Sequence, residues 1–336
     1  MTTNGHHPAT VLSVSNLKVA FKSDEGLVKA VDGIDFTVKR GQTLGLVGES
    51  GSGKSVSTKA IMQLLPKTAI IDSQSRIHYY RNGSEPVDIT RLKPTGREIR
   101  EIRGGEIAMI FQEPMASFSP VYTIGNHIME AILTHRRMTK KEAKELAIEM
   151  LDKVGLANPR VRIDQYPFEL SGGMRQRAMI ALALSTNPAV LIADEPTTAL
   201  DVTIQAQILE LMKQLQDEFE MAIIFITHDL GVIAQVADEV AVMYLGRIME
   251  RGRTHDVIFN PRHPYTQGLL KAIPKLTHLY ERLIPIGGDI PSPLSRPTGC
   301  PFHTRCLKRI PGRCDVNEPA VTPVAEGHEV SCFLYE

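Results

Sequence analysis

A glycine-rich segment near the N-terminus constrains the fold of this chain more than any other feature. Residues 48–55 read Gly-Glu-Ser-Gly-Ser-Gly-Lys-Ser, between the apolar stretch Thr43–Val47 and the helix-like segment Lys54–Leu65. Glycines let backbone N–H groups point inward around a phosphate, and the N-terminus of the next helix adds partial positive charge. The pattern G-x-x-x-x-G-K-[ST] between a strand and a helix therefore predicts a phosphate-binding loop (P-loop) in an α/β protein.

The residues of this P-loop are the first candidates for nucleotide binding. They are Gly48, Glu49, Ser50, Gly51, Ser52, Gly53, Lys54 and Ser55. Lys54 is expected to reach the β- and γ-phosphates, and the Ser55 hydroxyl is expected to ligate Mg²⁺. The competing interpretation is a tight glycine turn with an exposed lysine, which the flanking strand and helix disfavour.

A pair of carboxylates supplies the acidic partner that a P-loop needs for its metal. The apolar run from Val190 to Ala193 ends in Asp194 and Glu195. Asp194 is expected to hold Mg²⁺, directly or through water, and Glu195 to act as general base on the attacking water. Tandem carboxylates are usually solvated surface charge, but this pair directly follows a buried strand.

Strand-like and helix-like segments alternate along most of the chain. Strands are expected at Val11–Phe21, Val28–Val38, Thr43–Val47, Ile107–Phe111, Val190–Ala193 and Ala222–Thr227, and helices at Val202–Phe219 and Leu230–Ala237. Such alternation predicts a largely parallel sheet flanked by helices. Residues 113–188 are helical in character, including a capping box at Thr139–Glu142, whereas residues 66–106 are polar and irregular.

Charge and hydropathy narrow the class of protein. Lys+Arg 38 balance Asp+Glu 38, which argues against a protein whose main work is binding nucleic acid, because such binding needs a basic surface. No stretch approaches the roughly 20 apolar residues that span a bilayer, and the first nine residues lack a signal-peptide core. We therefore expect a protein that stays in the cytosol and can still dock onto a membrane protein.

The segment Leu170-Ser-Gly-Gly-Met-Arg-Gln176 resembles the signature motif of ABC ATPases, and it lies about 20 residues before the tandem carboxylates, as in that family. The resemblance implies a RecA-like, mainly parallel sheet core, an antiparallel β subdomain and a helical subdomain at about 113–188. It also implies that Ser171, Gly172 and Gly173 cap an ATP held by the P-loop of a second subunit.

Four further positions fit the same family. Gln112 looks like the Q-loop glutamine, which contacts Mg²⁺ and the lytic water, and Asp201 belongs to a D-loop-like segment, Ala199–Asp201. His228 resembles the switch histidine at the γ-phosphate. Phe21 occupies the place of an aromatic residue that stacks on adenine, although a strand Phe is more often core. The resemblance thus assigns catalytic roles to Glu195, His228 and Gln112, with Ser55, Gln112 and Asp194 around Mg²⁺.

Longer motifs resemble one group within the family, the ATP-binding subunits of dipeptide and oligopeptide permeases. They are Val47–Ser55, Met109–Met115, Ala193–Asp201, His263–Leu270 and Gly299–Cys306. The resemblance implies an ATP-hydrolysing subunit of a peptide importer, with oligosaccharides, nickel or opines as alternative cargo. It also implies two permease subunits, a second homologous ATPase, an extracytoplasmic solute-binding protein and a peripheral position on the inner face of the cell membrane. Beside the Q-loop, Pro114, Met115 and Phe118 are expected to expose apolar surface to a permease.

Prolines, glycines and all four cysteines set the C-terminal segment apart. We expect an ABC ATPase domain at 10–260 and an irregular appendage at 261–336.

The spacing Cys300-x5-Cys306-x7-Cys314-x17-Cys332 lacks the close pairs of zinc ribbons. Four thiolates on a loop suit a [4Fe–4S] cluster, and the resemblance implies the same, because some peptide-permease ATPases carry such a cluster in this appendage. Zinc, with His303 and His328 as spare ligands, and four reduced thiols are the alternatives. We expect a structural role for this tail and an ATP site that is independent of it.

Other classes of protein fit less well. ABC ATPases that act on DNA carry a long coiled coil between P-loop and signature, and only about 115 residues, without sustained heptads, separate Ser55 from Leu170 here. Translation-associated relatives carry two ATPase units in one chain, and this chain has one. A regulatory module without catalysis is disfavoured because Glu195 and His228 are both present. Nothing in the sequence identifies the transported solute.

Overall fold

The computed structural model describes residues 9–81, 85–112, 117–198, 200–272 and 286–336. These residues form two compact units, which are described separately. The first unit contains the described residues within Met1–Val11, Lys39–Gly41 and Leu92–Ile224, and the second contains those within Leu12–Val38, Gln42–Arg91 and Phe225–Glu336. None of the described helices combines the length and the apolar character needed to cross a membrane.

The second unit contains an antiparallel sheet in the order β2-β1-β5-β6, with β4 also paired to β1. Its strands are β1 (Thr10–Ser23), β2 (Gly26–Lys39), β4 (Ala69–Ile71), β5 (Arg76–Tyr79) and β6 (Val87–Asp88), followed by the 3₁₀ turn Ile89–Arg91. Alternate residues of β1 and β2, such as Leu12, Val14 and Ile34, are fully buried because side chains alternate between the faces of a strand. The two expected long strands are confirmed.

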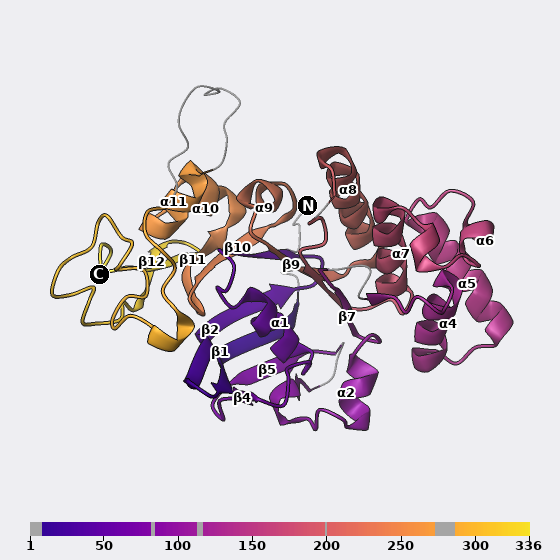
Figure 1. The fold of residues 1–336 in the computed structure, drawn as a ribbon, viewed down its shortest axis with the longest axis horizontal. Helices are drawn as coiled ribbons and strands as arrows, with labels where there is room; N and C mark the ends of the chain where they lie inside the picture. Colours follow the sequence, from indigo (N-terminus) through magenta and orange to yellow (C-terminus); the bar gives the residue numbers. More distant parts are fainter. Residues whose placement is uncertain (1–8, 82–84, 113–116, 199, 273–285) are drawn as a thin grey trace, which may run out of the picture. The chain divides into compact units, whose positions relative to one another are not determined.

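The P-loop lies in the same unit, after a buried parallel strand. All five residues of β3 (Thr43–Val47) are buried, and β3 pairs in parallel with β10 (Glu239–Tyr244). β10 continues antiparallel into β11 (Arg247–Arg253). The helices among the described residues of this unit are α1 (Lys54–Ile61), α9 (Leu230–Val236), α10 (Thr254–Phe259) and α11 (Pro264–Lys271). α9 and α10 pack against each other (Figure 1).

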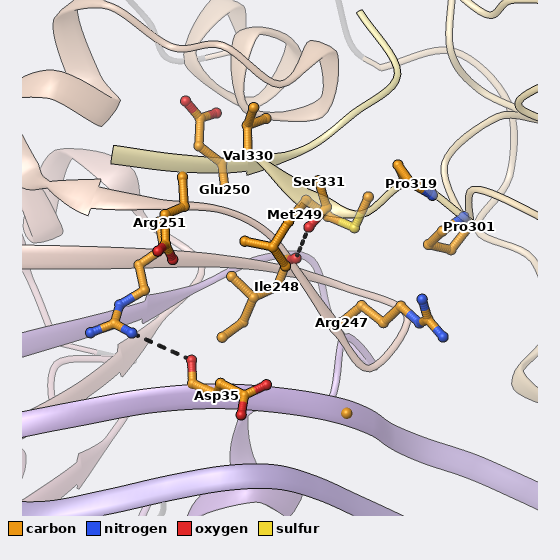
Figure 2. Close-up of a pocket in the computed structure, with 13 residues that line it drawn as sticks. Asp35, Arg247, Ile248, Met249, Glu250, Arg251, Pro301, Pro319, Val330 and Ser331 are labelled. Carbon is orange, nitrogen blue, oxygen red and sulfur yellow. Dashed lines mark hydrogen bonds between the residues drawn. The ribbon is translucent and has the colours of Figure 1, made fainter. Parts of the chain in front are cut away.

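The C-terminal tail extends this sheet instead of remaining irregular throughout. β13 (His328–Ser331) pairs with β11, placing Val330 opposite Glu250, and β12 (Val321–Ala325) pairs with β13. Figure 2 shows this junction, where the Ser331 hydroxyl donates to the carbonyl of Ile248 over 3.2 Å. The sequence did not predict these strands, and the division at residue 261 stays a prediction.

The first unit is mainly helical around two parallel strands. β7 (Ile107–Ile110) pairs with β8 (Val190–Asp194), and β9 (Ala222–Thr227) runs from this unit into the second. Its helices are α2 (Arg97–Ile102), α4 (Ile124–His135), α5 (Lys140–Lys153), α6 (Pro159–Arg162), α7 (Gly172–Leu184) and α8 (Val202–Phe219), with a 3₁₀ turn at Pro167–Glu169. α4, α5 and α7 pack together (Figure 1). The predicted capping box at Thr139 is present at the start of α5.

Candidate nucleotide-binding and catalytic site

The P-loop of the second unit folds around its own lysine. Lys54 is 6% exposed, and its Nζ donates to the carbonyls of Gly48 and Glu49 over 2.7 and 3.0 Å and to Ser52 Oγ over 3.2 Å. Gly53 has φ 101°, and a Cβ there would meet the carbonyl oxygen of Ala30 at 2.5 Å. The glycine is therefore required by both the turn and the close backbone approach.

The start of α1 favours an anion. Gly53 is its N-cap without a side-chain hydrogen bond, and the first turn contains no acidic residue. The first N–H groups of a helix lack intrahelical acceptors, and the helix dipole places positive charge there. A phosphate group can satisfy these donors, as the sequence predicts.

The first unit brings two of the expected catalytic side chains together. Gln112 Nε2 donates to Glu195 Oε2 over 3.0 Å, and the Thr198 hydroxyl donates to the same oxygen over 3.0 Å. Glu195 has a left-handed backbone, φ 48°, which is costly for a residue with a side chain and is typical of functional sites. Asp194, the preceding residue, is 4% exposed at the end of β8. The contact from Thr198 was not predicted.

The signature and the D-loop-like segment lie beside each other in the first unit. Ser171 is the N-cap of α7 and accepts from the N–H of Met174 over 3.4 Å. Asp201 is the N-cap of α8 and accepts from Ile204 over 2.9 Å. A Cβ on Gly173 would lie 3.1 Å from Cγ2 of Ile204, so only a small residue fits without adjustment.

The remaining predicted positions are dispersed. His228 is exposed after β9, and Phe21 is partly buried in β1 opposite Ala69. Both residues belong to the second unit, as does the P-loop. The other predicted site residues belong to the first unit: Gln112, Ser171–Gly173, Asp194, Glu195 and Asp201. The expectation that Phe118 exposes apolar surface is wrong, since it is 3% exposed. Pro114, Met115 and Ala199 lie outside the described residues.

The C-terminal tail contacts the P-loop directly, which sequence reasoning missed. Arg305 donates from Nη1 to Glu49 Oε2 over 2.7 Å and from Nη2 to Oε1 over 3.1 Å. The N–H of Glu49 donates to the Tyr265 hydroxyl over 2.9 Å. Burial, and after it the Glu49 carboxylate, raises the pKa of Tyr265, which therefore stays a neutral phenol. Arg305 and Tyr265 lie within motifs noted in the sequence, but no local pattern relates them to residue 49.

The four cysteines, Cys300, Cys306, Cys314 and Cys332, are free thiols. Burial raises the pKa of Cys300 to about 12, and electrostatic interaction with the other three thiols adds to the shift. The described residues contain no group of three or more His, Cys, Asp or Glu side chains that could hold a metal ion. The expected metal site is therefore not formed in this structure.

Each spare histidine ligand of the zinc alternative uses one ring nitrogen in a contact with the protein. Nδ1 of His303 lies 2.9 Å from the carbonyl of Cys300, and the buried His328 places Nε2 2.8 Å from Oε1 of Glu250. Each histidine keeps its other ring nitrogen, Nε2 of His303 and Nδ1 of His328, and a zinc-bound histidine normally makes such a contact through its second nitrogen.

Comparison with known proteins matches two family descriptions. "ABC transporter" matches residues 31–198, and "Oligopeptide/dipeptide transporter, C-terminal region" matches residues 249–314. The oligopeptide transport ATP-binding protein AppD of Bacillus subtilis (strain 168) is 47% identical over 98% of both chains. The dipeptide transport ATP-binding protein DppD of Escherichia coli (strain K12) is 45% identical over 96% of both.

A solved structure gives the same result for the fold. The ATP-binding cassette MJ0796, in a dimer bound to ADP and Pi, superposes with a TM-score of 0.63 at 26% identity. The alignment covers 72% of this chain and 98% of that one. The expected class, an α/β P-loop ATPase, is confirmed.

Proposed function

The chain belongs to the ABC transporter ATP-binding proteins with an oligopeptide/dipeptide-type C-terminal region, and we propose that it powers an importer of oligopeptides or dipeptides. ATP hydrolysis follows from membership of this family. The peptide cargo is supported by identity above 40%, over nearly the full length, to relatives named as oligopeptide and dipeptide transport proteins. Oligosaccharides, nickel and opines are the alternative cargo of the same machinery.

The observation that carries the catalytic proposal is the hydrogen bond between Gln112 and Glu195. Glu195 is the general base, which takes a proton from the water that attacks the γ-phosphate, while Gln112 orients the carboxylate and the water. Ser55, Gln112 and Asp194 would hold Mg²⁺, which would neutralise charge on the phosphate oxygens. His228 contacts the γ-phosphate, and Phe21 stacks on adenine.

The helix N-terminus at the signature supports a proposal about assembly. Ser171 and Gly172 are exposed at the start of α7, where they can meet the phosphates of an ATP held by another subunit. We assign Gly173 and Asp201 to the same interface. The partner is a second, homologous ATPase, and both dock on two permease subunits at the inner face of the membrane. An extracytoplasmic binding protein delivers the solute, and no nucleic acid is involved.

Reconstitution of the transporter in lipid vesicles tests this function. The complex of this chain with two permease subunits and a second ATPase should hydrolyse ATP faster when the binding protein and a mixed peptide library are present. Peptides should accumulate only when ATP is supplied on the side of this chain. Stimulation by an oligosaccharide or by nickel, with no response to peptides, would replace the peptide cargo with that alternative.

We further assign Cys300, Cys306, Cys314 and Cys332 as ligands of one [4Fe–4S] cluster with a structural role. The donor set supports this assignment. The backbone N–H of Ile310 donates to Sγ of Cys314 over 3.2 Å. The backbone N–H groups of Phe302, Lys308 and Leu334 lower the pKa of Cys300, Cys306 and Cys332 in turn, although burial outweighs them and raises each pKa overall. Such bonds favour thiolates, and a cationic centre would relieve the repulsion among them.

Metal analysis of the full chain tests the cluster. Protein purified without oxygen should be brown and contain about four irons and four acid-labile sulfides per chain. Stoichiometric zinc without iron in that preparation would favour the zinc alternative. Neither metal in an anaerobic, correctly folded preparation would leave four reduced thiols.

A further inference from the structure

We propose that Arg305 is a positioning residue for the P-loop, through which the cysteine-bearing tail sets the affinity of the chain for ATP. The inference rests on the proposed ATP-binding role of the P-loop. It gives the tail a part in nucleotide binding that its sequence does not suggest.

Arg305 is buried and makes polar contacts with each of its guanidinium nitrogens. Its side chain is 4% exposed. Besides the two bonds to Glu49, Nη1 donates to the Tyr244 hydroxyl over 3.4 Å, and Nε and Nη2 donate to the carbonyls of Gly287 and Ile286 over 3.2 and 3.4 Å. Burial lowers the pKa of Arg305, but the contacts to Glu49 and Tyr244 outweigh it and raise the pKa overall. The guanidinium is a fixed cation in a defined orientation.

Glu49, the second residue of the P-loop, is held at all of its polar groups. Its N–H donates to the Tyr265 hydroxyl, and its carboxylate accepts two hydrogen bonds from Arg305. Its carbonyl accepts from Lys54 Nζ over 3.0 Å and from the N–H of Ser52 over 3.2 Å. Because a two-bond contact to a guanidinium fixes the plane of a carboxylate, Arg305 fixes the peptide that Lys54 contacts.

The charges of Arg305 and Glu49 give a second reason why this ion pair should favour ATP binding. Glu49 places a carboxylate within a loop that must receive the phosphates of ATP, and an unpaired carboxylate there would repel them. Arg305 neutralises this carboxylate from the side of the tail. Loss of Arg305 would therefore weaken ATP binding both by loosening the loop and by exposing the phosphates to a like charge.

Aromatic packing holds Arg305 in place and connects it to the cysteines. Phe302 meets Tyr244 edge to face with ring centroids 5.3 Å apart, and it lies 5.2 Å from the ring of Tyr265. The N–H of Arg305 donates to the carbonyl of Phe302 over 3.0 Å, within the turn between Cys300 and Cys306. The conformation of this turn thus determines where the guanidinium lies.

Arg305→Ala tests the proposal in the full-length chain, with ATP affinity measured by calorimetry and kinetics measured in the assembled transporter. The Kd and KM for ATP should rise about tenfold, within the roughly 5- to 150-fold range of typical coupling between sites, with kcat changed by less than about twofold. Arg296→Ala is the matched control, since Arg296 is another largely buried tail arginine that pairs with Asp32 over 2.8 Å. It should lower the melting temperature and leave ATP affinity unchanged.

Two further variants separate orientation from folding. Arg305→Lys keeps the charge but loses the two-bond contact, so it should raise Kd by less than Arg305→Ala, about threefold. Adding Glu49→Gln to Arg305→Ala should recover part of the lost affinity, because the unpaired carboxylate is gone. If Arg305→Ala cannot be purified, the lysine variant carries the same test.

The proposal is wrong if Arg305→Ala and Arg305→Lys bind ATP within about twofold of the parent chain, or if Arg296→Ala weakens binding equally. Lys54→Ala distinguishes this failure from failure of the proposed function. If Lys54→Ala weakens ATP binding and the Arg305 variants do not, the P-loop role stands and the tail is independent of it. If Lys54→Ala binds ATP normally, the role of the P-loop itself is wrong.

Discussion

Gln112 and Glu195 are joined by a 3.0 Å hydrogen bond at the ends of two neighbouring parallel strands. The register of the sheet explains the contact, since Ile110 of β7 lies opposite Ala193 of β8. Each of the two polar residues follows two positions later. Parallel strands end at the same edge of a sheet, so residues at equal distance beyond a paired position come together. The contact between Gln112 and Glu195 therefore follows from the pairing of β7 with β8, and it does not depend on the conformation of a long loop.

Replacing Glu195 with Gln should abolish turnover while ATP binding persists. The amide keeps the shape of the side chain but cannot accept a proton, and loss of a general base typically reduces rate by about 10²–10⁴. Single-turnover hydrolysis and calorimetric ATP binding on the purified complex measure the two effects. Thr198→Val is the matched control, because it removes a second bond to the same carboxylate without removing the base. Near-normal hydrolysis by Glu195→Gln would exclude this residue as the base.

Replacing Lys54 with Ala should weaken ATP binding itself. Lys54 is expected to contact the phosphates of the bound nucleotide, so its loss removes a ground-state interaction as well as one in the transition state. Charge-assisted hydrogen bonds contribute about 1.5–3 kcal/mol, which corresponds to roughly a 10- to 150-fold increase in Kd. Lys67→Ala, at an exposed lysine after α1, is the matched control. Unchanged affinity in Lys54→Ala would contradict the P-loop assignment.

The local sequence pattern predicted several strands and helices around the candidate site with their correct bounds. The P-loop strand at Thr43–Val47, the helix at Val202–Phe219 and the strand at Ala222–Thr227 have the predicted bounds. Each has a strong signal of its own, either a continuous apolar run or helical periodicity bounded by a cap such as Asp201. Caps and apolar periodicity act within a few residues, so they can be read without knowledge of the tertiary structure.

Structure that depends on distant partners was not predicted. β12 and β13 have few buried residues, and they form because β11 offers an unpaired edge. The short helix α2, in a segment predicted as irregular, buries only Ile99 and Ile102. The pair Arg305–Glu49 joins residues separated by 256 positions, and no spacing rule connects them. Such contacts are set by packing rather than by local sequence.

Replacing Ser171 with Arg should impair the ATP site of the partner subunit rather than the site on this chain's own P-loop. The proposed heterodimer places this helix N-terminus against the partner's ATP, where a long cation would block closure. Photolabelling of each subunit with azido-ATP under turnover conditions measures the two sites separately. Ser171→Asn, which keeps a capping oxygen for α7, controls for loss of the cap. A purified transporter with two copies of this chain and no other ATPase would contradict the heterodimer.

Acid should destabilise the chain through His263. This residue is 1% exposed, and its Nδ1 accepts from the N–H of Tyr265 over 3.0 Å, so the ring is neutral. Burial lowers its pKa from 6.5 to about 3. Between these values the unfolded chain binds a proton that the folded chain does not, so stability is lost as pH falls below about 6.5. The loss should reach about 2 kcal/mol at pH 5.

Urea unfolding at pH 7 and pH 5 measures the contribution of His263. His263→Asn keeps an acceptor for the Tyr265 N–H and cannot titrate, so it should lose less stability between the two pH values than the parent chain. His255→Asn is the matched control at a histidine whose side chain is 75% exposed, and it should follow the parent. Equal pH dependence in His263→Asn and the parent would show that His263 titrates normally.

Replacing Cys306 with Ser should reduce both cluster content and ATP affinity. From sequence alone we expected the ATP site to remain intact after this change, but Cys306 directly follows Arg305, whose guanidinium holds Glu49 of the P-loop. Loss of one thiolate ligand would remove the folding free energy that the cluster supplies to this turn. Arg305 would then lose its fixed position, and the Kd for ATP should rise by about as much as in Arg305→Ala, about tenfold.

Three measurements on one preparation test this prediction: iron analysis for the cluster, limited proteolysis for the order of the region after residue 290, and calorimetric titration for the ATP affinity. Arg305→Ala provides the comparison, since it should lose ATP affinity while retaining its iron. A Cys306→Ser protein that lacks iron but binds ATP like the parent chain would show that the cluster does not act on the P-loop.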